Sequence, residues 1–327
     1  MLDCRISYVW RTKSDTQPSR TDTESSKSDS SASRTDSSAS KSDSLASRTD
    51  TDGWADARRM DGMGFSFFKP KELPHPASLT FTLDQTGHAY DDGHVGLEPT
   101  SLTITEKRVA IIGLNGAGKS TLLGLLDGSL KASAGTVTIV GDDEHLDPAS
   151  KHDLKRIDDL VGKVRREEIP NSFYRAKNIS EAVSEALKKH KVPEGERLAR
   201  IGNLFAHFNL AQVSKAKASE LDSEKRHLLA IAVALSFNPS AIVADEPSKG
   251  LDEIGTAHVA RALFSYDKQV IFATHDTDMI RRPEYAIDRT LVLDDHRIVF
   301  NGTPQEAVSF YEDLIRGKYE AAKSAAE

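Results

Sequence analysis

The segment from Gly113 to Thr121 constrains the fold of this chain more tightly than any other. Its sequence, Gly-Leu-Asn-Gly-Ala-Gly-Lys-Ser-Thr, satisfies the pattern G-x-x-x-x-G-K-[ST] at every fixed position. An apolar run at 109–112 precedes it and is typical of a buried strand, and leucines at 122–126 follow with helical spacing. The alternative is a glycine-rich turn with an incidental lysine. The flanking strand and helix argue against that alternative and predict an α/β core of mostly parallel strands.

The residue types of this loop suit a triphosphate. Glycines let successive backbone N–H groups point inward around an anion, and the helix that follows adds the positive end of its dipole. Lys119 would supply a cation for the β- and γ-phosphates, and the hydroxyl of Ser120 is suited to ligate Mg²⁺. The predicted nucleotide-binding residues of the loop are Asn115, Gly116, Ala117, Gly118, Lys119, Ser120 and Thr121.

Two later apolar runs end in polar residues that fit the same site. The run at 241–244 leads into Asp245 and Glu246, and the run at 270–273 leads into Thr274 and His275. Asp245 is predicted to hold the metal, and Glu246 to polarise the attacking water as a general base. His275 could touch the γ-phosphate, although a histidine after a strand is more often a loop residue.

Composition excludes several classes of protein. The chain has 327 residues, a formal net charge of −7 and one cysteine. This charge gives no electrostatic case for nucleic acid, and one cysteine allows no disulfide within the chain. No apolar run approaches the roughly 20 residues that span a bilayer. We therefore expect a cytoplasmic protein that reaches a membrane only through a partner.

The first part of the chain has a different character from the rest. Residues 14–53 are mostly Ser, Thr, Asp, Lys and Arg, and a unit of 14 residues repeats at Ser19, Ser33 and Ser47. Such a segment cannot bury enough apolar surface to fold, so residues 1–75 are predicted to be a disordered tail. The tail is either a phosphorylatable or partner-binding segment or a plain solvated extension, with Met60 or Met63 as later possible starts.

Residues 76–327 are predicted to form one nucleotide-binding domain. Alternating segments at 78–83, 102–104 and 136–140 predict a small antiparallel β subdomain, and 291–300 predicts a hairpin that turns at Asp294-Asp295. A helical insert is predicted at about 165–237. Its two apolar helix faces are 179, 182, 183 and 187, and then Leu198, Ile201, Leu204, Phe205 and Phe208. Thr303 to Glu306 reads as the capping box of a final helix.

The order of these motifs resembles that of the ATP-binding cassette ATPases over residues 78–302, on the P-loop NTPase fold. The resemblance implies ATP and Mg²⁺ as ligands, Glu246 and His275 as catalytic residues, and Asp245 with Ser120 at the metal. It also implies that Tyr90 stacks on adenine and that Leu251-Asp252 crosses between paired subunits. Residues 90–94 and 97–102 look most like the ATPases of energy-coupling-factor vitamin importers, the biotin type in particular.

This resemblance implies an ATP hydrolase that powers the transport of a small solute. Its partners would be a separate integral membrane transporter subunit and a second ATP-binding cassette, in a homodimer or a heterodimer. The chain would then lie on the inner face of the cell membrane. Two alternatives stay open: a non-transport ATP switch with slow hydrolysis, and a small-molecule kinase. The kinase would explain the glycine loop but not the later Asp-Glu-Pro and Thr-His-Asp motifs.

The chain departs from the family at its signature motif. Where the family has Leu-Ser-Gly-Gly-Gln, this chain has Leu221-Asp222-Ser223-Glu224-Lys225. A carboxylate about 4 Å from the partner's γ-phosphate would be repelled by roughly 4 kcal/mol, more than the roughly 1.5–3 kcal/mol of the lost serine bond. Neutralisation by Lys225 or Arg226 would remove this effect. Asp222 also suits a helix N-cap.

A second departure lies before the helical insert. Arg166 takes the place of a family glutamine that contacts Mg²⁺, and arginine cannot ligate a metal. No site is assigned to it.

Overall fold

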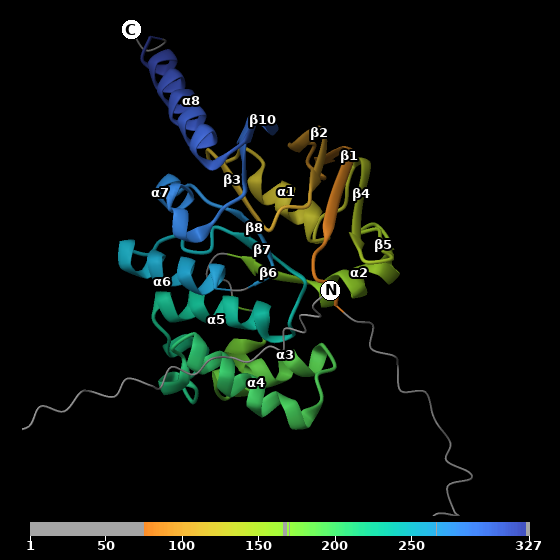
Figure 1. The fold of residues 1–327 in the computed structure, drawn as a ribbon, viewed down its shortest axis with the longest axis vertical. Helices are drawn as coiled ribbons and strands as arrows, with labels where there is room; N and C mark the ends of the chain where they lie inside the picture. The colour runs from red at the N-terminus through yellow and green to blue at the C-terminus, as the bar shows by residue number, and fades with distance from the viewer. Residues whose placement is uncertain (1–74, 166–168, 170, 266, 325–327) are drawn as a thin grey trace, which may run out of the picture. The chain divides into compact units, whose positions relative to one another are not determined.

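The computed structural model describes residues 75–165, 169, 171–265 and 267–324 (Figure 1). The predicted disordered tail therefore lies outside the described residues, apart from its last position, and so does Arg166. The described part contains two sheets and a group of helices at one end.

A six-stranded sheet forms the centre of the nucleotide-binding half, with the strand order β10-β9-β3-β8-β7-β6. Its five neighbouring strands from β9 to β6 are parallel, and β10 is an antiparallel edge. Every residue of β7 and β8 is buried, as expected of parallel strands covered on both faces. The strands are β3 (Arg108–Gly113), β6 (Val161–Arg165), β7 (Ala241–Asp245), β8 (Gln269–Ala273), β9 (Arg289–Asp294) and β10 (Arg297–Gly302).

The second sheet is antiparallel and confirms the predicted β subdomain. Its order is β2-β1-β4-β5, built from β1 (Thr80–Ala89), β2 (Val95–Ile104), β4 (Ala134–Gly141) and β5 (Glu144–Leu146). Helix α1 (Lys119–Leu126) contacts strands of both sheets, and nearly all of its residues are buried. The helix that follows the glycine loop is therefore part of the core and is held on two sides.

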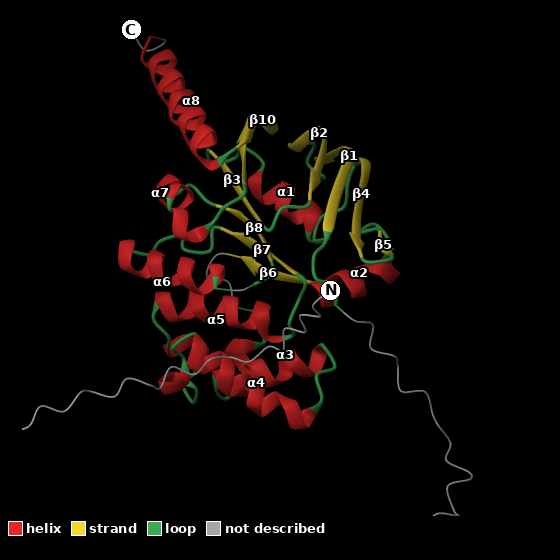
Figure 2. Ribbon diagram, viewed as in Figure 1, coloured by secondary structure: helices red, strands yellow, loops and turns green. Residues whose placement is uncertain are grey.

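The remaining helices cover the six-stranded sheet or build the insert (Figure 2). The insert consists of α3 (Ile179–Lys189), α4 (Glu194–His207) and α5 (Ser223–Ser236), and α5 packs against β6. The others are α2 (Lys151–Leu160), α6 (Glu253–Phe264), α7 (Thr277–Arg281) and α8 (Pro304–Ser324). The capping box of α8 is formed, because Glu306 accepts a hydrogen bond from Thr303 N and its own N–H donates to Thr303 Oγ1.

Two details differ from the sequence expectation. Leu198 was expected on the buried face of its helix but is 79% exposed. The buried face of α4 is formed by Ile201, Leu204 and Phe205. Leu198 lies at the edge of that face, near the start of the helix, and its side chain is exposed to solvent. The hairpin turns one residue later than expected, at Asp295-His296, where φ is 46° and 62°. Two positive φ values are typical of the type I′ turn that suits a twisted hairpin.

Paired substitutions on α4 test this correction. Ile201→Ala removes a side chain that is 5% exposed and should lower the free energy of unfolding by about 2–5 kcal/mol. Leu198→Ala keeps helix propensity high and removes an exposed side chain, so the change should stay below about 0.5 kcal/mol. Urea denaturation of both variants measures the difference. Equal losses would show that Leu198 is packed after all.

Candidate functional site

A cavity of about 350 Å³ lies where β3 and β7 end. Both strands run in the same direction with β8 between them, so their carboxyl ends meet at one edge of the sheet. Residues from the glycine loop, from the acidic end of β7 and from both sheets line it: Tyr90, His94, Gly96, Asn115, Gly116, Ala117, Gly118, Lys119, Ser120, Thr121, Asp245, Glu246, Lys249 and His296. Every predicted site residue except His275 is among them.

The backbone of the loop has the curvature that the glycines were expected to permit. Gly116 and Gly118 have φ of 83° and 99°, a region that side chains other than glycine rarely adopt. A Cβ on Gly118 would also lie 2.6 Å from the carbonyl oxygen of Gly96 on β2. The glycine at 118 is therefore required both by conformation and by the close approach of the second sheet.

Lys119 is held inside the loop. Its side chain is 7% exposed, and Nζ donates to the carbonyl oxygens of Gly113 at 2.8 Å and Leu114 at 3.2 Å. Nζ also lies 3.9 Å from Oε1 of Glu246. The loop cation and the predicted catalytic carboxylate are therefore direct neighbours.

Glu246 is buried in a strained conformation. It is 5% exposed and has φ of 50°, which is uncommon for a residue with a Cβ. Its Oε2 is 2.6 Å from Nδ1 of His275, which follows β8. His275 thus reaches the site through its contact with Glu246, although it does not line the cavity itself.

Asp245 fits a cation. The residue is 6% exposed, and its Oδ1 is enclosed without a hydrogen-bond partner among the residues that the structure describes. Such an oxygen is costly unless a ligand satisfies it. No group of three His, Cys, Asp or Glu side chains forms a metal cluster in the described ranges. One carboxylate and the Ser120 hydroxyl, completed by phosphate and water oxygens, is a donor set that Mg²⁺ accepts.

Tyr90 lies just after β1, at the rim of the cavity. The residue is 39% exposed, and its hydroxyl is 2.9 Å from Thr121 Oγ1. The ring of His94 lies beside it with the centroids 6.5 Å apart, and His296 lies 5.3 Å beyond His94. The side of the cavity that is predicted to hold adenine is therefore a row of three rings.

Four lining residues were missed by the sequence analysis: His94, Gly96, Lys249 and His296. His94 and Gly96 come from the second sheet, and a hydrogen bond from Glu98 N to His296 O joins that sheet to the β9–β10 turn. No motif signals this contact. Lys249 follows Asp-Glu-Pro-Ser directly, so its position in the chain could have indicated it.

Asp222 at the signature position makes the contacts of a helix cap. It precedes α5, and its Oδ1 accepts a hydrogen bond from Lys225 N at 2.8 Å. Its other oxygen forms an ion pair with the Lys225 ammonium. Slight burial acts to raise the pKa of Asp222, but these contacts outweigh it and hold the pKa below its usual value. The negative charge is thus partly compensated within the same turn.

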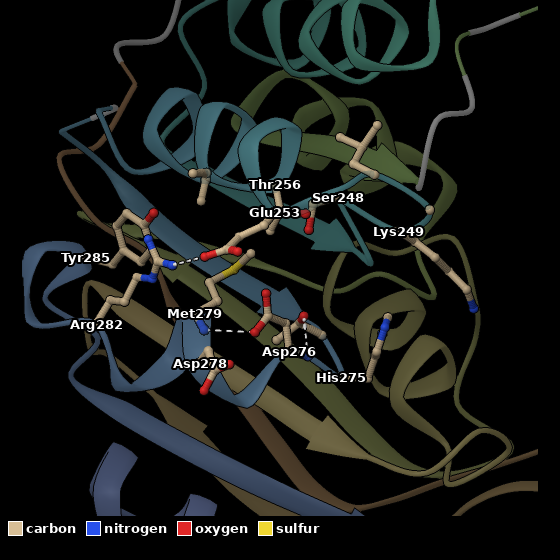
Figure 3. A pocket seen from close by; sticks show the side chains of 15 residues that line it. Ser248, Lys249, Glu253, Thr256, His275, Asp276, Asp278, Met279, Arg282 and Tyr285 are labelled. Carbon is tan, nitrogen blue, oxygen red and sulfur yellow. Dashed lines mark hydrogen bonds and ion pairs between the residues drawn. The ribbon is translucent and has the colours of Figure 1, made fainter.

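A second cavity of about 390 Å³ adjoins the loop after Asp245 (Figure 3). It lies between the start of α6 and α7, and its labelled side chains include Glu253, His275, Asp276 and Arg282. Asp252, in the predicted crossing loop, caps α6 by accepting from Gly255 N at 2.8 Å.

Comparison with known proteins identifies the family. The family described as ABC transporter matches residues 97–249. An ABC transporter ATP-binding protein of Deinococcus radiodurans is 32% identical over 233 residues, which is 71% of this chain and 97% of the relative. The biotin transport ATP-binding protein BioM of Rhizobium etli is 28% identical over 67% of this chain and 92% of its own length.

A solved structure agrees with these relatives. The structure of cbiO1 from Clostridium perfringens, described as part of the ABC transporter complex cbiONQ, superposes with a TM-score of 0.60. It is 27% identical and covers 72% of this chain and 93% of its own. Within the described residues, no helix has both the length and the apolar character needed to cross a membrane. The 32% identity to the Deinococcus radiodurans protein over 71% of this chain, together with the family match, shows that the chain belongs to the ABC transporter family, among its ATP-binding subunits.

Proposed function

We propose that this chain binds and hydrolyses ATP to power the passage of a small solute through a separate integral membrane subunit. The proposal rests on two contacts of Glu246: Oε1 lies 3.9 Å from Nζ of Lys119, and Oε2 lies 2.6 Å from Nδ1 of His275. A loop that holds phosphates and a buried carboxylate that can polarise water are two parts that ATP hydrolysis needs. The family supplies the connection with transport.

Each residue then has a separate task. Glu246 orients and deprotonates the attacking water, and His275 positions Glu246 through Nδ1. Asp245 and Ser120 would hold Mg²⁺, and the unpartnered Oδ1 of Asp245 supports this assignment. When bound, Mg²⁺ neutralises charge on the β- and γ-phosphates. Tyr90 would stack on adenine from the rim of the cavity.

The names of similar proteins support the choice of partners. BioM is named for biotin transport, and cbiO1 is described as part of a transporter complex. We infer a membrane subunit as one partner and a second ATP-binding cassette as the other. The chain would then be held at the inner face of the cell membrane by its membrane partner.

Asp222 favours a heterodimer. Capping and pairing with Lys225 compensate its charge, but they do not give it the hydroxyl donor that the family signature offers to a partner's γ-phosphate. A second cassette with an intact signature would complete the site built on Lys119 and Glu246. The same substitution would also suit a slow non-transport switch, so the behaviour of the purified chain separates the two.

Substitution of Glu246 tests the hydrolytic role. Glu246→Gln keeps the shape of a buried side chain but removes the general base, so phosphate release should fall by about 10²–10⁴-fold. ATP affinity should change by less than about fivefold, since the phosphate loop is intact. Steady-state phosphate release and equilibrium ATP binding measure the two effects, with the chain alone and with its partner. Normal turnover by the chain alone would refute the need for a partner.

Lys119→Ala serves as the complementary variant for binding. It removes the loop cation and should weaken ATP affinity by at least about tenfold, because a charge-assisted contact is lost. If ATP affinity stays unchanged in this variant, the proposed function is wrong at its first step.

Substitution of Asp222 tests the asymmetric pair. Asp222→Ser keeps a good helix cap, removes the charge and supplies a hydroxyl, so self-stimulated hydrolysis of the purified chain should rise by about tenfold. Asp222→Asn is the matched control, because it also caps and is neutral but has no hydroxyl. Equal rates for the serine variant and wild type would mean that this position does not serve a second copy of the chain.

A further inference from the structure

We propose that Lys249 is a second cation for the terminal phosphate of ATP, acting beside Lys119 in the same chain. The inference rests on the proposed ATP-binding function and adds a residue that determines affinity for the triphosphate. The cavity of about 350 Å³ at the ends of β3 and β7, here called the nucleotide cavity, is lined by two lysines, Lys119 and Lys249.

A tight turn fixes Lys249 beside the acidic pair. Its backbone N–H donates to the carbonyl oxygen of Glu246 at 3.1 Å, with Pro247 and Ser248 between them. Proline is favoured at the second position of such a turn because its φ is already set. Gly250 follows with φ of 85°, so the chain bends away directly after the lysine. The side chain is therefore presented at the mouth of the site by a short, constrained loop.

Lys249 borders two cavities. Among the described residues it alone lines both the 350 Å³ nucleotide cavity and the 390 Å³ cavity beside α6. Figure 3 shows its side chain pointing away from Glu253 and Asp276 in the second cavity. The ammonium is thus directed out of the acidic neighbourhood, and the nucleotide cavity is the other space that it borders.

Lys119, Glu253 and Asp276 already have partners. Lys119 contacts two carbonyl oxygens and Glu246, whereas the exposed ammonium of Lys249 has no ion pair or hydrogen bond within the described ranges. In the second cavity, Glu253 lies 3.7 Å from Arg282, and Asp276 caps α7 by accepting from Met279 N. Lys249 is therefore a cation available to a ligand.

The charge of the ligand explains why a second cation is useful. Lys119 and Lys249 balance Asp245 and Glu246, so the four ionic groups that line the cavity sum to zero formal charge. A triphosphate brings more negative charge than one Mg²⁺ removes. A lysine on a flexible stem at the rim can reach the excess charge without being buried before the ligand arrives. Its backbone is bonded to Glu246, the residue proposed to orient the attacking water, so the terminal phosphate is the part of ATP that the proposal assigns to it.

This position predicts a difference between ATP and ADP. Lys249→Gln should weaken ATP binding by about tenfold, the value of one charge-assisted contact, and ADP binding by less than about twofold. The full chain is titrated with each nucleotide in the absence of Mg²⁺, which prevents hydrolysis. Lys189→Gln is the matched control, because Lys189 is an exposed lysine of α3 that lines neither cavity. This control should bind both nucleotides like wild type.

The outcomes separate this inference from the function on which it rests. If Lys249→Gln weakens ATP and ADP binding equally, or does not weaken ATP binding, the proposed role of Lys249 is wrong. The proposed function survives that result as long as Lys119→Ala still weakens ATP binding. If neither variant alters ATP affinity, both the inference and the proposed function fail. A thermal melt of Lys249→Gln that matches wild type excludes a folding defect as the cause of a loss.

Discussion

The contact between Lys119 and Glu246 is the constraint on which the rest of the site depends. Burying an ammonium alone is costly, and burying a carboxylate alone is equally so. Here Nζ of Lys119 and Oε1 of Glu246 lie 3.9 Å apart. Lys119 also donates to the carbonyl oxygens of Gly113 and Leu114, and Glu246 also contacts Nδ1 of His275. This arrangement requires the end of β7 to stay beside the glycine loop. The all-buried strands β7 and β8 provide that fixed distance, since a parallel sheet cannot shift one strand without breaking its hydrogen bonds.

Much of this arrangement was predictable from the sequence. The glycine loop predicts a strand before it and a helix after it. The apolar run before Asp245 predicts a second strand of the same sheet. Parallel strands bring their carboxyl ends together, so the meeting of Lys119, Asp245 and Glu246 follows from the order of elements. The order of elements puts His275 at the end of the next strand, but its contact with Glu246 depends on side-chain geometry that no spacing encodes.

The parts that could not be predicted depend on contacts between distant elements. His296 enters the site because the β9–β10 hairpin bonds to β2, two segments nearly two hundred residues apart. Leu198 has the right spacing for its helix face but lies at the margin of that face, where packing and not periodicity decides exposure. Asp222 caps α5, and its place at the signature position comes from the resemblance alone, so the sequence leaves open which of the two constraints fixes the residue.

The cavity wall has a consequence for how the domain responds to its ligand. Tyr90 and His94 lie in the turn between β1 and β2 of the antiparallel sheet, whereas the glycine loop follows β3 and His296 lies in the β9–β10 turn of the six-stranded sheet. A nucleotide bound as proposed would therefore touch residues of both sheets at once. A ligand that binds only the native arrangement stabilises it by RT ln(1 + [L]/Kd), so above Kd this stabilisation would grow with the logarithm of the nucleotide concentration. The seam between the sheets is also held by a hydrophobic core that joins β1, α1 and β3, so a nucleotide would add to a contact between the sheets that already exists.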